Sequence, residues 1–227
     1  MGIPVAYMLM FGVMILGMLV QWNLKSKFKK FSQVRLDSGL TGREVAERML
    51  REHGITDVQV ISTAGQLTDH YNPASRTINL SEPVYNSNSV MAAAVAAHET
   101  GHAIQHAVGY APLKMRSALV PVVQFSSNIV QWVLIAGIFL VKTFPQLLLA
   151  GIILFALTTL FSIVTLPVEV DASRRALAWL EQNRVTSYEQ QPMAATALRS
   201  AAYTYFAAAI GSIATLLYYL SIYSGRR

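Results

Sequence analysis

The sequence predicts a mainly α-helical membrane protein, in which four transmembrane helices carry a small α+β domain. Hydrophobic residues make up 53% of the 227 residues and charged residues only 13%, whereas soluble domains carry about 25% charged residues. Four stretches approach or exceed the ~20 apolar residues that a bilayer crossing needs. There is no cysteine, which excludes disulfides and thiolate metal sites.

The four predicted spans cover residues 3–22, 119–141, 147–166 and 201–223. The first has no basic start and is followed by lysines 25, 27, 29 and 30. A signal peptide shows the reverse order of charge. We therefore interpret the first span as a retained anchor.

The distribution of Lys and Arg predicts the orientation. Eleven of the 18 lie in residues 23–116 and four in residues 167–199, which leaves only Lys142, Arg226 and Arg227 for the other side. The positive-inside rule then places both polar segments in the cytoplasm and both termini outside. We expect a multi-pass plasma-membrane protein, with lipid contacts. The net charge of +6 is interpreted as an orientation signal, so no nucleic-acid partner is expected.

The first polar segment reads as a small α+β domain. A helix is predicted from the Thr41 cap to His53, because Glu44 completes a capping box and Gly54 ends the helix. Strands are predicted over residues 58–62 and 76–81, with a turn-rich segment at 69–75. A second helix should begin near Asn88 or Ser89 and run through His106, before Gly109 and Pro112.

That second helix contains the sequence His98-Glu99-Thr100-Gly101-His102, which fits H-E-x-x-H. Two histidines four residues apart share one helical face and can bind one zinc ion. Glu99 would reach the open coordination position and act as the base for a zinc-bound water that attacks a peptide carbonyl. The alternative is a helix with two surface histidines and no metal.

The third ligand must lie elsewhere in the chain. Gln105 occupies the position where a metzincin has glycine, and His106 comes too early to be the third histidine of that class. A carboxylate on a second helix is the remaining choice, and the downstream acidic residues are Glu169, Asp171, Glu181 and Glu189.

Glu169 is the ligand that we favour, because small side chains share its helical face and would allow close contact with the zinc helix. It follows the third span directly, so we expect that span to run through Pro167 into the ligand helix as one kinked rod. The alternative is an interfacial charge. Asp171 is expected to pair with Arg174 or Arg175, or to hydrogen-bond a ligand imidazole.

Two segments resemble a known family. His-Glu-Thr-Gly-His-Ala-Ile-Gln-His and Val-Glu-Val-Asp-Ala-Ser-Arg-Arg-Ala resemble the YugP-type neutral zinc metallopeptidases of bacterial membranes and, more distantly, the Ste24 and HtpX membrane proteases. In those relatives the third ligand is the Glu of a Glu-x-x-Ala-Asp motif on a later helix. Glu169 and Ala172 match that motif, whereas Ser173 stands in place of its Asp. The resemblance implies a gluzincin-like membrane endopeptidase.

Several further residues are candidates with competing interpretations. His106 could orient a ligand or bind a second ion, or simply end its helix. His70, Arg199 and Tyr203 are candidates to stabilise the oxyanion formed during attack, and each is also an ordinary surface or interfacial residue type.

The segment Thr77-Ile78-Asn79-Leu80 precedes the zinc helix and is a candidate substrate strand. An exposed strand there could pair with an extended peptide, whereas a core strand of a small sheet could not.

The second span carries Gln124, Ser127, Asn128 and Gln131 on one helical face. We expect this polar stripe to face the inside of the bundle or a wet cavity, or to bond a neighbouring helix.

The sequence thus predicts residues 1–23 as the first transmembrane helix and 24–116 as a cytoplasmic zinc domain. Residues 117–166 form the second and third spans, 167–199 the cytoplasmic ligand helix, and 200–227 the fourth span with a short tail. The predicted activity is zinc-dependent peptide hydrolysis with one Zn²⁺, on membrane or membrane-proximal proteins. The alternative is a zinc-binding membrane scaffold or regulator without turnover. Protein substrates are expected, and a membrane partner or a homo-oligomer is left open.

Overall fold

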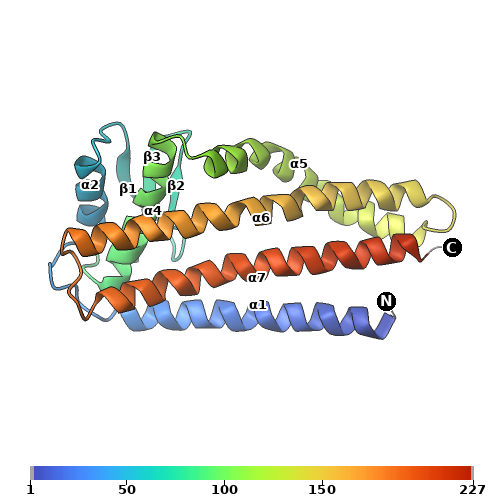
Figure 1. The fold of residues 1–227 in the computed structure, drawn as a ribbon, viewed down its shortest axis with the longest axis horizontal. Helices are drawn as coiled ribbons and strands as arrows, with labels where there is room; N and C mark the ends of the chain where they lie inside the picture. The colour runs from blue at the N-terminus through green and yellow to red at the C-terminus, as the bar shows by residue number, and fades with distance from the viewer. Residues whose placement is uncertain (1–2, 226–227) are drawn as a thin grey trace. The chain divides into compact units, whose positions relative to one another are not determined.

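The computed structural model describes residues 3–225, which form seven helices and three strands (Figure 1). The helices are α1 (Ile3–Phe31), α2 (Gly42–Glu52), α3 (Glu82–Tyr85), α4 (Val90–Ala107), α5 (Ala111–Phe139), α6 (Pro145–Gln182) and α7 (Gln191–Ser224). The strands are β1 (Gln59–Thr63), β2 (His70–Asn72) and β3 (Thr77–Ser81). Arg226 and Arg227, which entered the orientation argument, lie outside the described residues.

The chain forms two compact units. The first, called here the membrane unit, contains the residues up to 20, residues 114–166 and the residues from 204 on. The second, called the polar unit, contains residues 21–113 and 167–203. Each unit is described separately below.

Among the described residues, α1, α5, α6 and α7 are long and apolar enough to cross a bilayer. They coincide with the four predicted spans, and α1, α6 and α7 extend beyond theirs. α5 begins before its predicted span but ends at Phe139, short of the predicted end at residue 141. α1 continues through the lysine cluster to Phe31, and α6 passes through Pro167 to Gln182 as predicted. The helices continue because Lys, Ala, Arg and Glu are strong helix formers that preserve the backbone hydrogen bonds where the apolar stretch ends.

Within the membrane unit, small residues bring α5 and α6 into close contact. A Cβ atom at Gly137 would lie 2.6 Å from the Cα atom of Leu148, and one at Gly151 would lie 2.8 Å from the Leu134 side chain. α5 buries Ser126, Val130 and Leu134. The side of α5 that packs against the rest of the membrane unit therefore carries only apolar or small side chains.

The polar stripe of α5 lies on a different face. Gln124, Ser127, Asn128 and Gln131 are all exposed. The prediction that they face the inside of the bundle is wrong, because α5 instead buries Ser126, Val130 and Leu134, which lie on another side of the helix.

The polar unit contains a three-stranded sheet in the order β1-β3-β2. β1 and β3 are parallel, and β2 is antiparallel to β3. β2 was not predicted: its three residues lie in the segment interpreted as turns, and such a short strand shows no alternation of polar and apolar residues. The predicted helix at Thr41 is confirmed, capping box included.

β3 is the central strand, so the candidate substrate strand Thr77-Ile78-Asn79-Leu80 has no free edge for a peptide. Residues Thr77 to Asn79 pair with both neighbouring strands, and Ile78 and Leu80 are fully buried. The substrate-strand prediction is therefore wrong, and the core-strand alternative holds. The two edge strands of the sheet are β1 and β2.

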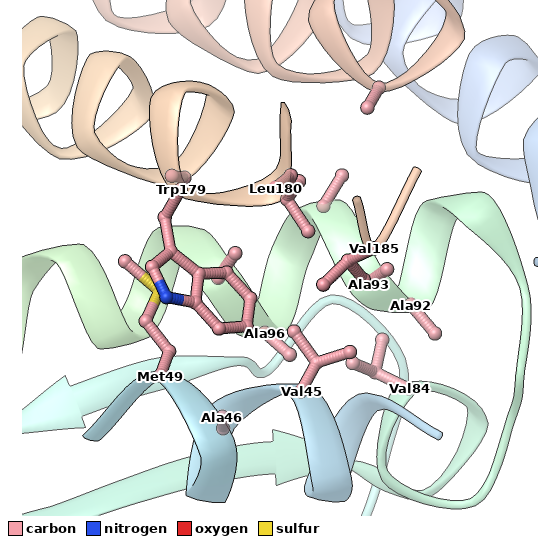
Figure 2. Packing of buried hydrophobic residues seen from close by; sticks show 14 of the residues in the cluster. Val45, Ala46, Met49, Val84, Ala92, Ala93, Ala96, Trp179, Leu180 and Val185 are labelled. Atoms are coloured by element: carbon pink, nitrogen blue, oxygen red, sulfur yellow. The ribbon is translucent and has the colours of Figure 1, made fainter. Parts of the chain in front are cut away.

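The core of the polar unit lies between α2, α4 and the end of α6 (Figure 2). The alanine-rich start of α4 lets these elements approach, since Ala92, Ala93 and Ala96 are buried. The indole N–H of Trp179 donates to Glu52 over 2.7 Å, which ties α6 to α2. The labelled members of this core are Val45, Ala46, Met49, Val84, Ala92, Ala93, Ala96, Trp179, Leu180 and Val185.

Candidate metal centre

The H-E-x-x-H residues lie in the middle of helix α4, on a helix as predicted. Ser89 caps the helix by accepting a hydrogen bond from the Ala92 N–H. The helix ends at Ala107, before Gly109 adopts a positive φ of 67°. His98 and His102 lie one turn apart, with ring centroids 4.7 Å apart.

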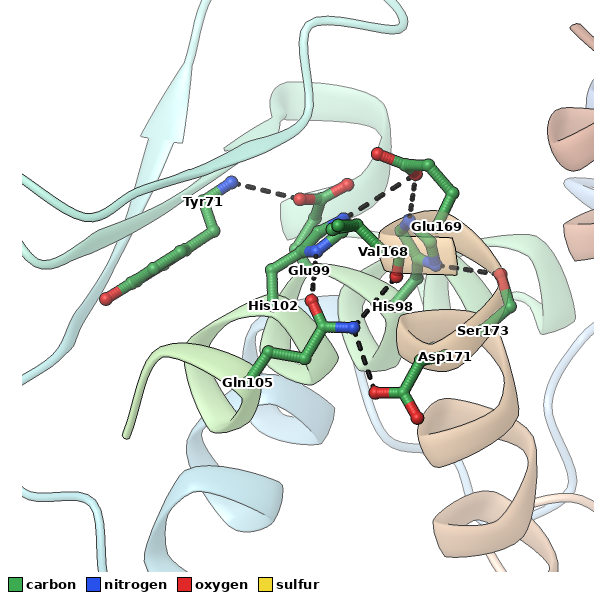
Figure 3. Close-up of polar contacts among 9 residues, drawn as sticks. All are labelled: Tyr71, His98, Glu99, His102, Gln105, Val168, Glu169, Asp171 and Ser173. Carbon is green, nitrogen blue, oxygen red and sulfur yellow. Dashed lines mark hydrogen bonds and ion pairs between the residues drawn. The ribbon is translucent and has the colours of Figure 1, made fainter. Parts of the chain in front are cut away.

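Glu169 of α6 lies directly against these two rings (Figure 3). Its Oε2 atom is 3.2 Å from Nε2 of His98 and 3.7 Å from Nε2 of His102. One ligand atom from each residue lies within 4.8 Å of the other two. All three side chains are mostly or fully buried.

The three residues fit a zinc ion. Ligands 2.0–2.1 Å from a tetrahedral zinc ion lie about 3.3 Å from one another, close to the two separations above. Two imidazoles and one carboxylate also leave a fourth position open, which is the arrangement of catalytic zinc sites.

The approach of α4 to α6 depends on the glycine inside the motif. A Cβ atom at Gly101 would lie 2.7 Å from the carbonyl oxygen of Ala172. No side chain can therefore occupy position 101 without moving one of the two helices. Gly101 and Ala172 form a small-residue contact of the kind that the sequence indicated, and Ala176, one turn further along α6, is also buried.

Gln105 determines which nitrogen of His102 is available. Its amide nitrogen donates to the Val168 carbonyl over 2.8 Å and to Oδ2 of Asp171 over 3.0 Å. Its amide oxygen therefore faces Nδ1 of His102, 3.0 Å away, so this nitrogen must carry the proton. Nε2 is left with a lone pair for a metal ion.

Ser173 occupies the corresponding position beside His98. Its hydroxyl oxygen lies 3.1 Å from Nδ1 of His98. If Nε2 binds a metal ion, Nδ1 carries the proton. The Ser173 hydroxyl oxygen can then accept a hydrogen bond from the Nδ1–H group. The residue that replaces the relatives' Asp thus still contacts a ligand histidine.

Asp171 acts through Gln105 and also pairs with arginines. Oδ1 accepts from Arg174, and Oδ2 accepts from Arg175 over 2.6 Å. The expected pairing with arginine is therefore present, whereas Asp171 contacts no ligand imidazole directly and is linked to His102 only through the Gln105 amide.

The environment of His102 favours a positive charge nearby. Burial acts to lower the pKa of its imidazole, but the hydrogen bond and charge of Glu169, with smaller effects of Glu99 and Gln105, raise the pKa above its ordinary value. A cation between these groups is therefore stabilised, whether it is a proton or a metal ion.

Glu99 is held by the sheet. The backbone N–H of Tyr71, on the edge strand β2, donates to Oε2 of Glu99 over 2.9 Å. Oε1 of Glu99 makes no hydrogen bond with any residue of the described chain. One oxygen is thus fixed and the other is available to a water molecule.

His106 lies beside Tyr71. Its Nδ1 atom is 2.7 Å from the Tyr71 hydroxyl, and both residues line a cavity of about 330 Å³. The other lining residues are Ile55, Asp57, Val58, Arg76, Ala103 and Ala107. His106 is not in the group of three ligands.

The remaining candidates show no polar contact with the three ligands among residues 3–225. Nδ1 of His70 is 2.8 Å from its near neighbour, the Thr68 carbonyl oxygen. Arg199 and Tyr203 are exposed on α7. Their role in oxyanion stabilisation stays a prediction.

Three residues contact the site in ways that the sequence did not predict. They are Gln105, Ser173 and Tyr71. Gln105 was given no role in orienting a ligand, although its spacing of three residues from His102 places it within reach. Tyr71 contributes a backbone group, which no side-chain motif can reveal.

Two comparisons with known proteins match this chain. A family described as "Putative neutral zinc metallopeptidase" matches residues 6–224. A Bacillus subtilis (strain 168) protein named "Putative membrane protease YugP" is 40% identical over 207 residues, which cover 91% of each chain. No solved structure matches.

Proposed function

The chain belongs to the neutral zinc metallopeptidase family, and on that premise we propose that it is a membrane-embedded, gluzincin-like zinc endopeptidase. The observation that carries the proposal is the group formed by His98, His102 and Glu169, with the Glu99 carboxylate on the same helix. The family and the relative support a protease role, and the resemblance seen in the sequence is confirmed.

The protein residues divide the chemistry among them. His98, His102 and Glu169 would hold one zinc ion, which when bound polarises the substrate carbonyl and the attacking water. Glu99 takes a proton from that water and delivers it to the leaving amine. The Tyr71 N–H holds Glu99 in place through Oε2, so that Oε1 can receive the proton.

The test is Glu99→Gln in the purified, zinc-loaded protein. The variant should bind one zinc ion as tightly as the wild type, while kcat/KM for peptide cleavage falls by about 10²–10⁴, the usual contribution of a general base. Metal analysis and a fluorogenic peptide assay measure the two quantities. Glu181→Gln, an exposed carboxylate of α6, is the matched control and should cleave normally.

Either of two results would contradict the proposal. Unchanged cleavage by the Glu99→Gln protein would reject the role of Glu99. Zinc binding without cleavage by any form, tested on a broad peptide library, would instead favour the scaffold without turnover.

The orientation is also a proposal. We place both polar segments in the bacterial cytoplasm and both termini outside, because most Lys and Arg residues lie in those segments. An even number of candidate spans supports this arrangement.

We further propose that substrates are membrane proteins or membrane-near segments. Glu169 follows the predicted third span by three residues within the continuous helix α6, so the ligand group should lie close to the bilayer surface. In vesicles, a peptide tethered to the membrane should be cleaved with a higher kcat/KM than the same peptide free in solution. Equal values would contradict the preference.

A further inference from the structure

The exposed polar stripe of α5, called here the amide face, consists of Gln124, Ser127, Asn128 and Gln131. None of these four side chains makes a hydrogen bond to any residue in the described part of the chain. All four lie inside a helix that is apolar and long enough to cross a membrane. They are therefore polar groups facing outward in the middle of a candidate span.

Other polar side chains in the membrane unit form hydrogen bonds within that unit. The hydroxyls of Thr158, Ser162 and Thr165 donate to carbonyl oxygens three or four residues earlier. Thr159 also bonds the hydroxyl of Ser212 on α7 over 2.9 Å. The three amides have no such bond, and hydrocarbon offers them no water, so the amide face needs a partner with hydrogen-bonding groups.

We propose that the amide face joins two copies of this chain. Gln124, Asn128, Gln131 and Ile135 follow one another at intervals of four, three and four residues, which is the spacing of a coiled-coil seam. Ile135 is also exposed, with 39% of its surface accessible. The four residues therefore form a continuous strip about 17 Å long on one side of α5.

The chemistry of the strip favours a second copy over another partner. Two copies with the same orientation in a membrane are related by a two-fold axis along the bilayer normal, so two α5 helices pair in parallel and each amide meets its own equivalent. An amide both donates and accepts, and is complementary to itself. An apolar transmembrane segment of a substrate would leave the three amides unpaired. A polar residue in such a seam also specifies two strands in register.

The experiment uses the absence of natural cysteine. Asn128→Cys introduces a single thiol on the strip, and Ile129→Cys introduces one at the same depth on a neighbouring exposed face. After mild oxidation in lipid vesicles, Asn128→Cys should form a covalent dimer on a non-reducing gel, and Ile129→Cys should stay monomeric. Absence of the dimer, or equal dimer yield from both variants, would overturn the proposal.

A second measurement removes the hydrogen bonds directly. The variant with Gln124→Leu, Asn128→Leu and Gln131→Leu should raise the monomer–dimer dissociation constant at least tenfold, as measured by energy transfer between labelled copies in vesicles. Val122→Leu, which changes an exposed residue on the other side of the same helix, should leave the constant unchanged. A wild-type chain that stays monomeric, or crosslinking of Asn128→Cys only to another protein, would reject the second copy as the partner. Neither assay requires turnover, so its result is independent of the proposed peptidase activity.

Discussion

Gln105 is a fully buried amide whose three hydrogen bonds all serve the ligand group. Two are donated to α6, and the third orients His102. Because the two acceptors fix the direction of the amide, the proton of His102 is fixed on Nδ1 as well. We infer that Gln105 is a positioning residue for the metal ligand.

Replacing Gln105 by Leu should lower zinc affinity by about 10–100-fold, the usual effect of removing a group that orients a metal-bound histidine. Competition with a zinc chelator of known affinity measures the change. Gln191→Leu is the matched control, because it removes side-chain bonds with the Leu177 carbonyl and the Thr186 hydroxyl outside the ligand group. If both variants lose zinc equally, the effect is general destabilisation and the positioning role is wrong.

At the scale of elements, the site depends on how closely α4 and α6 approach. His98 and His102 come from one helix and Glu169 from the other, and Gly101 is where the backbones are nearest. A side chain at position 101 would therefore separate the ligands as well as the helices.

Gly101→Ala should destabilise the protein by about 1–3 kcal/mol, as overpacking of a tight contact does, and should weaken zinc binding. Thermal unfolding with and without added zinc checks both effects. Gly17→Ala is the control: a Cβ atom there meets nothing within 4 Å, so zinc affinity should not change. Normal zinc affinity in Gly101→Ala would show that the two helices can separate without cost to the site.

At the scale of the whole molecule, the proposed orientation can be tested with cysteine labelling. Thr143→Cys lies between α5 and α6, and Tyr188→Cys lies between α6 and α7, where the tyrosine is 96% exposed. In intact cells, a membrane-impermeant maleimide should label position 143 at once and position 188 only after permeabilisation. The reverse order would place the ligand group outside the cytoplasm.

Much of the architecture was accessible from the sequence because its signals are local. Apolar stretches of the right length predict spans, and the Thr41 capping box and the Ser89 cap predict helix starts. The spacing of His98 and His102 places both rings on one face as soon as the segment is helical. Glu169 was chosen among four acidic residues, and the structure brings it, rather than the other three, to the two histidines.

The failures came where a residue's role depends on what lies across the fold. A strand pattern does not say whether a strand is central or at an edge, so β3 was a candidate for binding substrate. A polar stripe on a helix does not say which way the helix is turned, so the amide face was expected inside the bundle.

By itself, the sequence determined that this chain has four apolar spans, a helix bearing H-E-x-x-H and a chemistry limited to His and carboxylate ligands, because length, periodicity and residue type are properties of neighbours along the chain. The tertiary structure alone decided that Glu169 meets both imidazoles, that Gln105, Ser173 and the Tyr71 N–H hold the site in place, and that the α5 amides face outward. These facts arise from packing between segments up to 75 residues apart, where steric fit and hydrogen-bond satisfaction choose the partners.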